Sequence, residues 1–221
     1  MTDDSPDYAS PPCYAHEFEN AAPLPGVEVG PWRKAQREAL IAARMALPVD
    51  ERTRVAEEVA LVLDRLIAPG PGVIVSLYWP FRAELDLRGW MARAQARGAR
   101  IALPIVEAKA QPLKFREWLP GCKMERGVWN ILNPADTDWL TPNVVIAPLV
   151  GFDPGCFRLG YGGGFFDRTL AALNPRPMVI GVGHPAAALR TIHPQAHDIP
   201  MDVIVTGKDR VMRRVGGSAP A

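Results

Sequence analysis

The sequence has few cysteines, no long apolar run and almost no net charge. Its cysteines form no CxxC pair, which argues against a disulfide framework and favours a reduced, cytoplasmic protein. The longest apolar run, residues 144–152, is interrupted by a proline and a glycine and falls short of the ~18 residues that a membrane span needs. A formal charge of +1 excludes a globally basic nucleic-acid-binding chain. We therefore expect neither nucleic acid nor a membrane as a partner.

What the sequence does contain is enough apolar material for a folded core. Hydrophobic residues make up 48% and charged residues 22% of the 221 positions, values typical of a globular domain. Residues 1–30 differ, with six acidic side chains, five prolines and no lysine or arginine. We predict a flexible acidic extension at 1–30, one α/β domain at 31–207 and a short basic, flexible tail at 208–221.

Apolar periodicity predicts alternating helices and strands in the domain. Helices are expected at 32–46, 55–66, 87–94 and from about Gly164, and strands at 72–79, 99–106, 143–150, 178–183 and 202–206. Such short apolar strands separated by helices are typical of a mostly parallel sheet with helices on both faces. Ligands bind outside the carboxyl ends of strands in sheets of this kind.

The first predicted helix has two distinct faces. Trp32 and several alanines recur at helical spacing, whereas Arg33, Arg37 and Arg44 fall together on another face. From spacing alone, the arginines are equally consistent with a solvated basic face and with an anion site.

A glycine-rich loop carries the most specific signal. The segment 158–168 reads Arg-Leu-Gly-Tyr-Gly-Gly-Gly-Phe-Phe-Asp-Arg, follows the 143–150 strand and precedes a predicted helix. Its glycines let backbone amides approach an oxyanion, and the first turn of the helix adds further N–H groups. It matches neither GxGxxG, whose third glycine would fall on Phe165, nor a Walker loop. A tight strand-to-helix turn is the structural alternative, but the flanking Arg158 and Arg168 favour a phosphate site.

The same loop resembles the signature of the 5-formyltetrahydrofolate cyclo-ligase family. The resemblance covers about residues 31–207 in the same order. It includes Arg33 and Arg37, Tyr78-Trp79-Pro80 followed by Glu84-Leu85-Asp86, Gly127 to Ile131 before Pro134, Pro148 to Asp153, and His197 to Asp202. Membership of this family implies a fold like that of the NagB/RpiA/CoA transferase group. It also implies a monomer or weak homodimer.

The resemblance implies a reaction and a set of site residues. Family members use ATP and Mg²⁺ to close 5-formyltetrahydrofolate into 5,10-methenyltetrahydrofolate through phosphorylation of the formyl oxygen and attack by N10. Arg158 and Tyr161 are the implied catalytic residues, Asp167 and Asp198 the implied Mg²⁺ ligands, and Glu84, Trp129, Tyr161 and Phe165 the implied folate contacts. The implied ATP contacts are Arg33, Lys34, Arg37, Arg158, Leu159, Gly160, Tyr161, Gly162, Gly163, Gly164, Phe165 and Phe166.

Without the resemblance, simpler interpretations of single residues stay open. Asp167 suits the first turn of a helix, Asp198 a loop cap and Glu84 an exposed helix start. The aromatic residues fit a core equally well.

The sequence also departs from the family pattern. Phe165-Phe166 stands where a tyrosine pair is usual, Arg33 where lysine is usual, and Asn133 where an acid is usual. The stretch 183–192 has no glutamine, and the glycine loop has no lysine. Two rival functions follow: a non-catalytic regulatory paralogue that binds nucleotide or folate, and an enzyme that acts on another phosphorylated substrate with the same fold.

Overall fold

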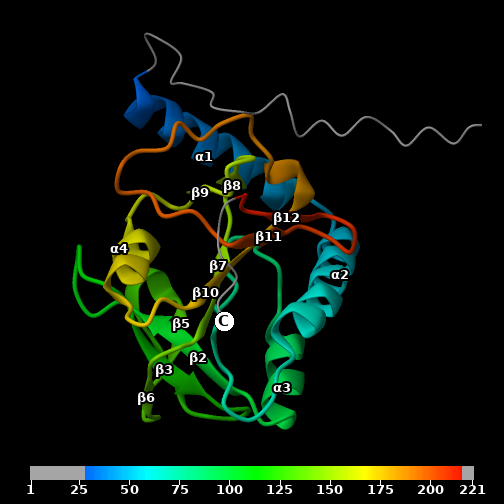
Figure 1. Ribbon diagram of the computed structural model, residues 1–221, viewed down its shortest axis with the longest axis vertical. Helices are drawn as coiled ribbons and strands as arrows, with labels where there is room; N and C mark the ends of the chain where they lie inside the picture. Colours follow the sequence, from blue (N-terminus) through cyan, green and yellow to red (C-terminus); the bar gives the residue numbers. More distant parts are fainter. Residues whose placement is uncertain (1–27, 216–221) are drawn as a thin grey trace, which may run out of the picture.

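A twisted sheet of eight strands forms the centre of the computed structural model, which describes residues 28–215 (Figure 1). The strand order is β12-β11-β10-β7-β1-β2-β3-β6. The strands are β1 (Ile74–Ser76), β2 (Arg100–Ile105), β3 (Lys114–Trp118), β6 (Trp139–Leu140), β7 (Val144–Pro148), β10 (Met178–Val182), β11 (Val203–Val205) and β12 (Val211–Arg213). The five strands from β11 to β2 run parallel, and the outer pairings are antiparallel. The predicted mostly parallel sheet is confirmed.

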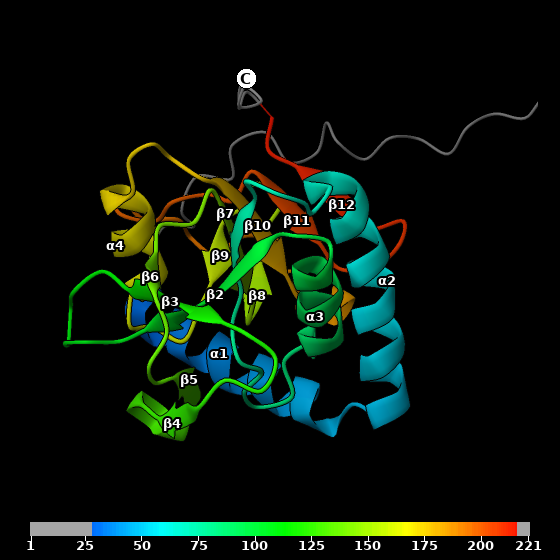
Figure 2. The same ribbon diagram turned by 90° about the horizontal axis from the view of Figure 1, so that it is seen from below.

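Helices cover both faces of this sheet. The helices are α1 (Val29–Ala46), α2 (Val49–Ile67), α3 (Arg88–Ala96) and α4 (Phe165–Ala172). Helices α2 and α3 share one core cluster with the sheet, and α4 contributes to a cluster on the opposite face. Helix α1 lies beyond the carboxyl end of β7, next to β8 (Gly151–Phe152) (Figures 1 and 2).

Strand β7 shows why the central strands read as continuous apolar runs. Val144 and Ile146 pack toward α2 and α3, whereas Val145 and Ala147 pack toward α4. Successive side chains of a strand point to opposite faces, so a strand covered on both sides must be apolar at every position. Each predicted parallel strand is confirmed, with ends up to three residues shorter than its apolar run.

Several short strands outside the parallel core carry no such signal. They include β3 and β6 at one edge of the sheet, the pair β4 (Met124–Arg126) and β5 (Leu132–Pro134), and the pair β8 and β9 (Arg158–Leu159). Edge strands face solvent along much of their length, so polar residues replace the apolar run. Strand β3, with the sequence Lys-Phe-Arg-Glu-Trp, has only two buried side chains, those of Phe115 and Trp118.

The predicted basic tail requires a correction. Residues 211–213 form β12, which pairs antiparallel with β11, and Met212 packs against the core on the α4 side. A three-residue strand with one inward side chain is too short for its periodicity to be visible in the sequence. At the other end, helix α1 begins at Val29, and most of the predicted 1–30 extension lies outside the described residues. No helix in residues 28–215 is long and apolar enough to cross a membrane.

Candidate active site

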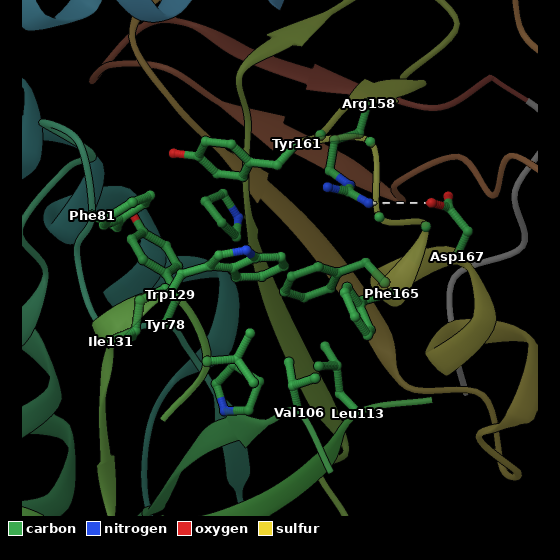
Figure 3. Close-up of a pocket in the computed structure, with 18 of the residues that line it drawn as sticks. Tyr78, Phe81, Val106, Leu113, Trp129, Ile131, Arg158, Tyr161, Phe165 and Asp167 are labelled. Carbon is green, nitrogen blue, oxygen red and sulfur yellow. Dashed lines mark hydrogen bonds and ion pairs between the residues drawn. The ribbon is translucent and has the colours of Figure 1, made fainter. Parts of the chain in front are cut away.

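A pocket of about 420 Å³ opens at the carboxyl ends of β1, β2 and β7 (Figure 3). Tyr78 and Trp79 enter it just after β1, Val106 just after β2, and Pro148 at the end of β7. Helix α1, the glycine loop and the β4–β5 arm (residues 124–134) complete the walls. The site therefore lies where the topology of a parallel sheet places ligands.

The glycine loop packs tightly around arginine side chains. Gly162 has a φ of +93°, which side-chain-bearing residues rarely adopt, and a Cβ there would stand 3.3 Å from the guanidinium carbon of Arg37. At Gly160 a Cβ would collide with the guanidinium of Arg158. The positive φ favours glycine at position 162, and at both positions the guanidinium of an arginine lies against bare backbone.

Three arginines converge on the pocket beside this loop. Arg37 Nε donates to the carbonyl oxygen of Gly160 at 2.7 Å, and Arg158 Nη2 donates to Asp167 Oδ2 at 3.3 Å (Figure 3). Burial lowers the pKa of Arg158, an effect that the charges of Asp167 and Asp198 partly oppose. Burial and the charge of Arg33 likewise lower the pKa of Arg37. Cations held close together at a desolvated site favour an anionic ligand.

Arg158 also carries an unused donor. Its Nε is buried and has no hydrogen-bond partner within residues 28–215. The guanidinium carbon lies 4.9 Å from the centre of the Phe166 ring, so the ring supports the cation from one side. A buried donor without a partner is costly, and a ligand oxygen would satisfy it.

The two predicted metal ligands lie in the same pocket and contact arginines. Arg33 donates to Asp198 from Nη2 at 2.5 Å and from Nη1 at 3.3 Å. Burial alone would raise the pKa of Asp198, but hydrogen bonds from Arg33 and from the Gln195 amide hold it below its usual value. Asp167 accepts one bond from Arg158 and another from the Ile199 amide at 3.2 Å. Asp167, whose two bonds are both longer than 3 Å, is the carboxylate with more freedom to bind a cation.

No group of three or more His, Cys, Asp or Glu residues in the described part of the chain is placed to hold a metal by itself. Two carboxylates of the pocket nevertheless offer hard oxygen donors. A magnesium ion is commonly held by one or two carboxylates together with phosphate oxygens and water. The donor set therefore fits a cation that arrives with a phosphate ligand.

Glu84 is buried in the wall of the pocket, in the loop after β1. Its Oε1 accepts a hydrogen bond from the Tyr161 hydroxyl at 2.9 Å, and its Oε2 accepts one from the Phe81 amide at 3.0 Å. Burial raises the pKa of Glu84 to about 7, with the charge of Arg44 acting in the opposite direction. A carboxylate held this way has lone pairs left for adjacent N–H donors of a planar ligand.

Aromatic side chains surround the space next to Glu84. The Tyr161 ring lies 6.0 Å from Phe81, and the Trp129 ring meets Phe165 edge to face at 5.8 Å. Trp129 has a φ of +56° at the tip of the β4–β5 arm and is 56% exposed. In Figure 3 these rings face a common space, with Arg158 and Asp167 on one side and Tyr78 and Phe81 on the other.

All but one of the predicted site residues line this pocket. The exception is Lys34, which is exposed on α1 and does not reach the lining. Lys34 follows Arg33 by about 100° around the helix, whereas Arg37, four residues on, returns to the same face. Arg33 and Arg37 thus lie together at the pocket, and Lys34 lies outside its lining.

The structure adds pocket residues that the sequence did not single out for a site. The additional lining residues include Tyr78, Phe81, Arg82, Val106, Leu113, Ile131, Asn133 and His197. The position of Tyr78 at the carboxyl end of the predicted 72–79 strand was the available signal, because side chains there reach the ligand edge of the sheet. In the β4–β5 arm, the resemblance at Gly127 to Ile131 was the available signal, since its strands are only three residues long.

Comparison with known proteins agrees with this geometry. Residues 29–207 match the model of the 5-formyltetrahydrofolate cyclo-ligase family. The chain belongs to that family, whose members are ligases. It is 28% identical over 173 residues to the 5-formyltetrahydrofolate cyclo-ligase of Escherichia coli K12, covering 74% of this chain and 93% of the relative. It is also 28% identical over 191 residues to the cyclo-ligase of Mycolicibacterium smegmatis, covering 81% and 96%.

Two solved structures share the fold of this cyclo-ligase family member. The NMR structure of 5,10-methenyltetrahydrofolate synthetase from Aquifex aeolicus aligns with a TM-score of 0.71 and 26% identity, covering 86% of this chain and 96% of that one. The 5,10-methenyltetrahydrofolate synthetase of Mycoplasma pneumoniae aligns with a TM-score of 0.66 and 21% identity, covering 80% and 99%. At that identity the second structure supports the fold alone.

Proposed function

We propose that this protein converts 5-formyltetrahydrofolate to 5,10-methenyltetrahydrofolate, with ATP converted to ADP and phosphate. One observation carries the proposal: a single pocket joins a cationic glycine loop to a buried carboxylate surrounded by aromatic rings. The first feature suits a triphosphate, and the second suits a pterin with its attached aromatic ring. We call the two sides the phosphate end (Arg33, Arg37, residues 158–167 and Asp198) and the folate end (residues 78–84 and the β4–β5 arm, with the Tyr161 and Phe165 rings).

The reaction needs both ligands in one pocket. A formyl amide oxygen is a poor leaving group, so the γ-phosphoryl group of ATP is transferred to it and ADP departs. N10 of the folate then attacks the formyl carbon, the carbon–oxygen bond breaks, and phosphate leaves with that oxygen. Catalysis of this kind depends mainly on positioning and on stabilising phosphoryl charge.

At the phosphate end, arginines and backbone amides would bind the triphosphate. Arg158 is the catalytic cation in this account, because its Nε is buried without a partner in the described part of the chain and its guanidinium lies between the loop and Asp167. Arg33 and Arg37 approach from α1, and residues 159–164 offer the backbone of the loop. Phe165 and Phe166 have no hydroxyl, but the Phe166 ring supports Arg158.

Asp167 and Asp198 would hold a magnesium ion in the presence of ATP. Asp167 would be the principal ligand, since Asp198 is bound on both oxygens by Arg33. When bound, the ion offsets negative charge on the phosphate oxygens. Arg33 and Arg158, the arginine partners of the two carboxylates, would contact the phosphates.

At the folate end, Glu84 would accept hydrogen bonds from adjacent N–H groups of the pterin. Tyr161 lies between the two ends and donates its hydroxyl hydrogen to Glu84, so it is in reach of both ligands. Trp129 and Phe165 would cover the rings of the folate. Their edge-to-face contact places two aromatic surfaces on the same side of the pocket.

The direct test is an absorbance assay of product formation. Purified protein is mixed with 5-formyltetrahydrofolate, ATP and Mg²⁺, and the near-ultraviolet band of the methenyl product is followed. ATP-dependent growth of the band is the expected result. Binding of both ligands by folded protein without product would favour the regulatory paralogue, which the missing hydroxyls at Phe165 and Phe166 motivate. Failure to bind folate would favour another phosphorylated substrate.

We also propose that the protein acts in the cytoplasm as a monomer or weak homodimer. Cys122 and Cys156 are free thiols, which suits a reducing compartment. Fractionation and sedimentation measurements test the two statements.

A further inference from the structure

Arg44 is buried beneath the folate end of the pocket without lining it. The residue is 8% exposed and projects from α1. Its guanidinium donates to the carbonyl oxygens of Arg82 at 3.0 Å and Leu149 at 3.2 Å, and to the Tyr161 hydroxyl oxygen at 2.6 Å. Burying a cation against neutral acceptors is costly, so this arrangement calls for an explanation beyond packing.

The contact with Tyr161 fixes the direction of one hydroxyl hydrogen. Arginine has donors only, so the Tyr161 oxygen must accept from Arg44. The tyrosine has a single hydrogen to donate, and the acceptor within reach is Glu84 Oε1 at 2.9 Å. With the Phe81 amide on Oε2, both oxygens of Glu84 receive a hydrogen bond from the protein. The hydrogen bonds that link Arg44, Tyr161 and Glu84 are therefore all donated in one direction, from Arg44 toward Glu84.

We propose that Arg44 is a positioning residue that acts through the Tyr161 hydroxyl to hold Glu84 as an acceptor-only carboxylate facing the folate. This inference rests on the proposed function, because it assigns a task to the site where the pterin would bind. Arg44 touches neither ligand in this account, since it is absent from the lining of the pocket. Its effect on the substrate passes through two other side chains.

Arg44 is the charged side chain with the largest expected effect on the pKa of Glu84. Burial raises the pKa of Glu84 to about 7, and Arg44 is the main charge that opposes the rise. The titratable and charged residues that face or adjoin Glu84 are Arg44, Tyr161, Tyr78, Arg82, Asp86, Arg52 and His184. Loss of Arg44 or of the Tyr161 hydroxyl removes a group that favours the ionised carboxylate, so either change raises the pKa further.

The first test measures the pKa of Glu84 directly and does not require enzymatic activity. Protein labelled with ¹³C at the glutamate carboxyl carbon is titrated by NMR, and the Glu84 signal is assigned by its loss in Glu84→Gln. We expect the midpoint to rise by about one pH unit in Arg44→Met and in Tyr161→Phe. Arg54→Met on α2, which removes an exposed arginine paired with Glu58, is the matched control and should not move it. An unmoved midpoint in folded Arg44→Met would overturn the proposal.

The second test asks whether Arg44 acts on Glu84 through the Tyr161 hydroxyl, which we call the relay, or has only a structural role. Arg44→Met should weaken folate binding about tenfold and change ATP binding little, and Tyr161→Phe should weaken folate binding to a similar extent. If Arg44 acts through Tyr161, the double variant is weakened by much less than the product of the single losses. Losses that multiply, or equal losses for folate and ATP, would contradict the relay and indicate a structural role.

A conservative variant of Arg44 tests the positioning role even if Arg44→Met does not fold. Arg44→Lys retains the charge and should fold even if Arg44→Met does not. We expect this variant to have a Glu84 midpoint close to that of wild type but a weaker affinity for folate. The reason is that an ammonium group cannot reproduce the three contacts of the guanidinium. Equal recovery of both would count against positioning. Folate affinity is measured by equilibrium binding and does not depend on turnover. If the wild-type protein binds folate but forms no product, the proposed function is refuted, and the binding and titration data still test the role of Arg44.

Discussion

The two ends of the pocket are built in different ways. The phosphate end is mostly one continuous segment, residues 158–167, whose glycines and charges lie close together in the sequence. The folate end is assembled from the loop after β1, the β4–β5 arm and Tyr161, so its key hydrogen bond joins residues 77 positions apart. Charge dominates the first end, whereas shape and one buried carboxylate dominate the second. Changes at the two ends should therefore damage different kinetic constants.

The largest expected effect is at the phosphate end. Arg158→Met removes the buried cation next to the glycine loop and should lower kcat roughly a thousandfold, as loss of a transition-state arginine does in phosphoryl transfer. Folate affinity, measured by equilibrium binding, should stay nearly unchanged. A variant that loses folate affinity as strongly as kcat would show that the two ends are not separable.

A somewhat smaller effect is expected for the carboxylate beside that arginine. Asp167→Asn should weaken the response to Mg²⁺ about a hundredfold while leaving the fold intact. The measurement is kcat as a function of Mg²⁺ concentration, with circular dichroism as the control for folding. Unchanged activity at low Mg²⁺ would remove Asp167 from the metal site.

The matching change at the folate end is Glu84→Gln. A neutral amide loses a charge-assisted acceptor, so the KM for 5-formyltetrahydrofolate should rise roughly ten- to thirtyfold, with the KM for ATP within about twofold of wild type. Steady-state kinetics with each substrate varied in turn test this split. Equal rises in both KM values would contradict the assignment of Glu84 to the folate end.

The smallest effect is a pH dependence confined to the folate end. With burial raising the pKa of Glu84 to about 7, the carboxyl gains a proton as the pH falls below that value, and its charged acceptor for the N–H groups of the pterin is lost. The KM for folate should therefore rise by up to about tenfold per pH unit below pH 7, and this rise should vanish in Glu84→Gln. A pH dependence that persists in the variant belongs to another group.

The same contrast explains what could be predicted from the sequence. The glycine loop was predictable because the residues that make it, from Arg158 to Asp167, are neighbours in the chain. The parallel strands were predictable because burial on both faces leaves a continuous apolar run. Strand β12 was not, since Met212 is the one inward-facing side chain of a three-residue strand.

Helix α1 shows most clearly what could not be predicted from the sequence. Its periodicity predicted the helix and grouped Arg33, Arg37 and Arg44 on one face, but not which face packs inward. In the structure Arg33 and Arg44 are buried, whereas Ala35 and Ala39 are exposed. Arginines can occupy the inner face because Asp198 and backbone carbonyls from distant segments receive their hydrogen bonds. Spacing within a helix carries no information about those partners.

The central claim is that the pocket brings the γ-phosphoryl group of ATP to the formyl oxygen of the folate. The most direct measurement uses 5-formyltetrahydrofolate labelled with ¹⁸O at the formyl oxygen and mass spectrometry of the phosphate released. The account predicts that the label leaves in the phosphate in step with methenyl product. Product formed with unlabelled phosphate would contradict it.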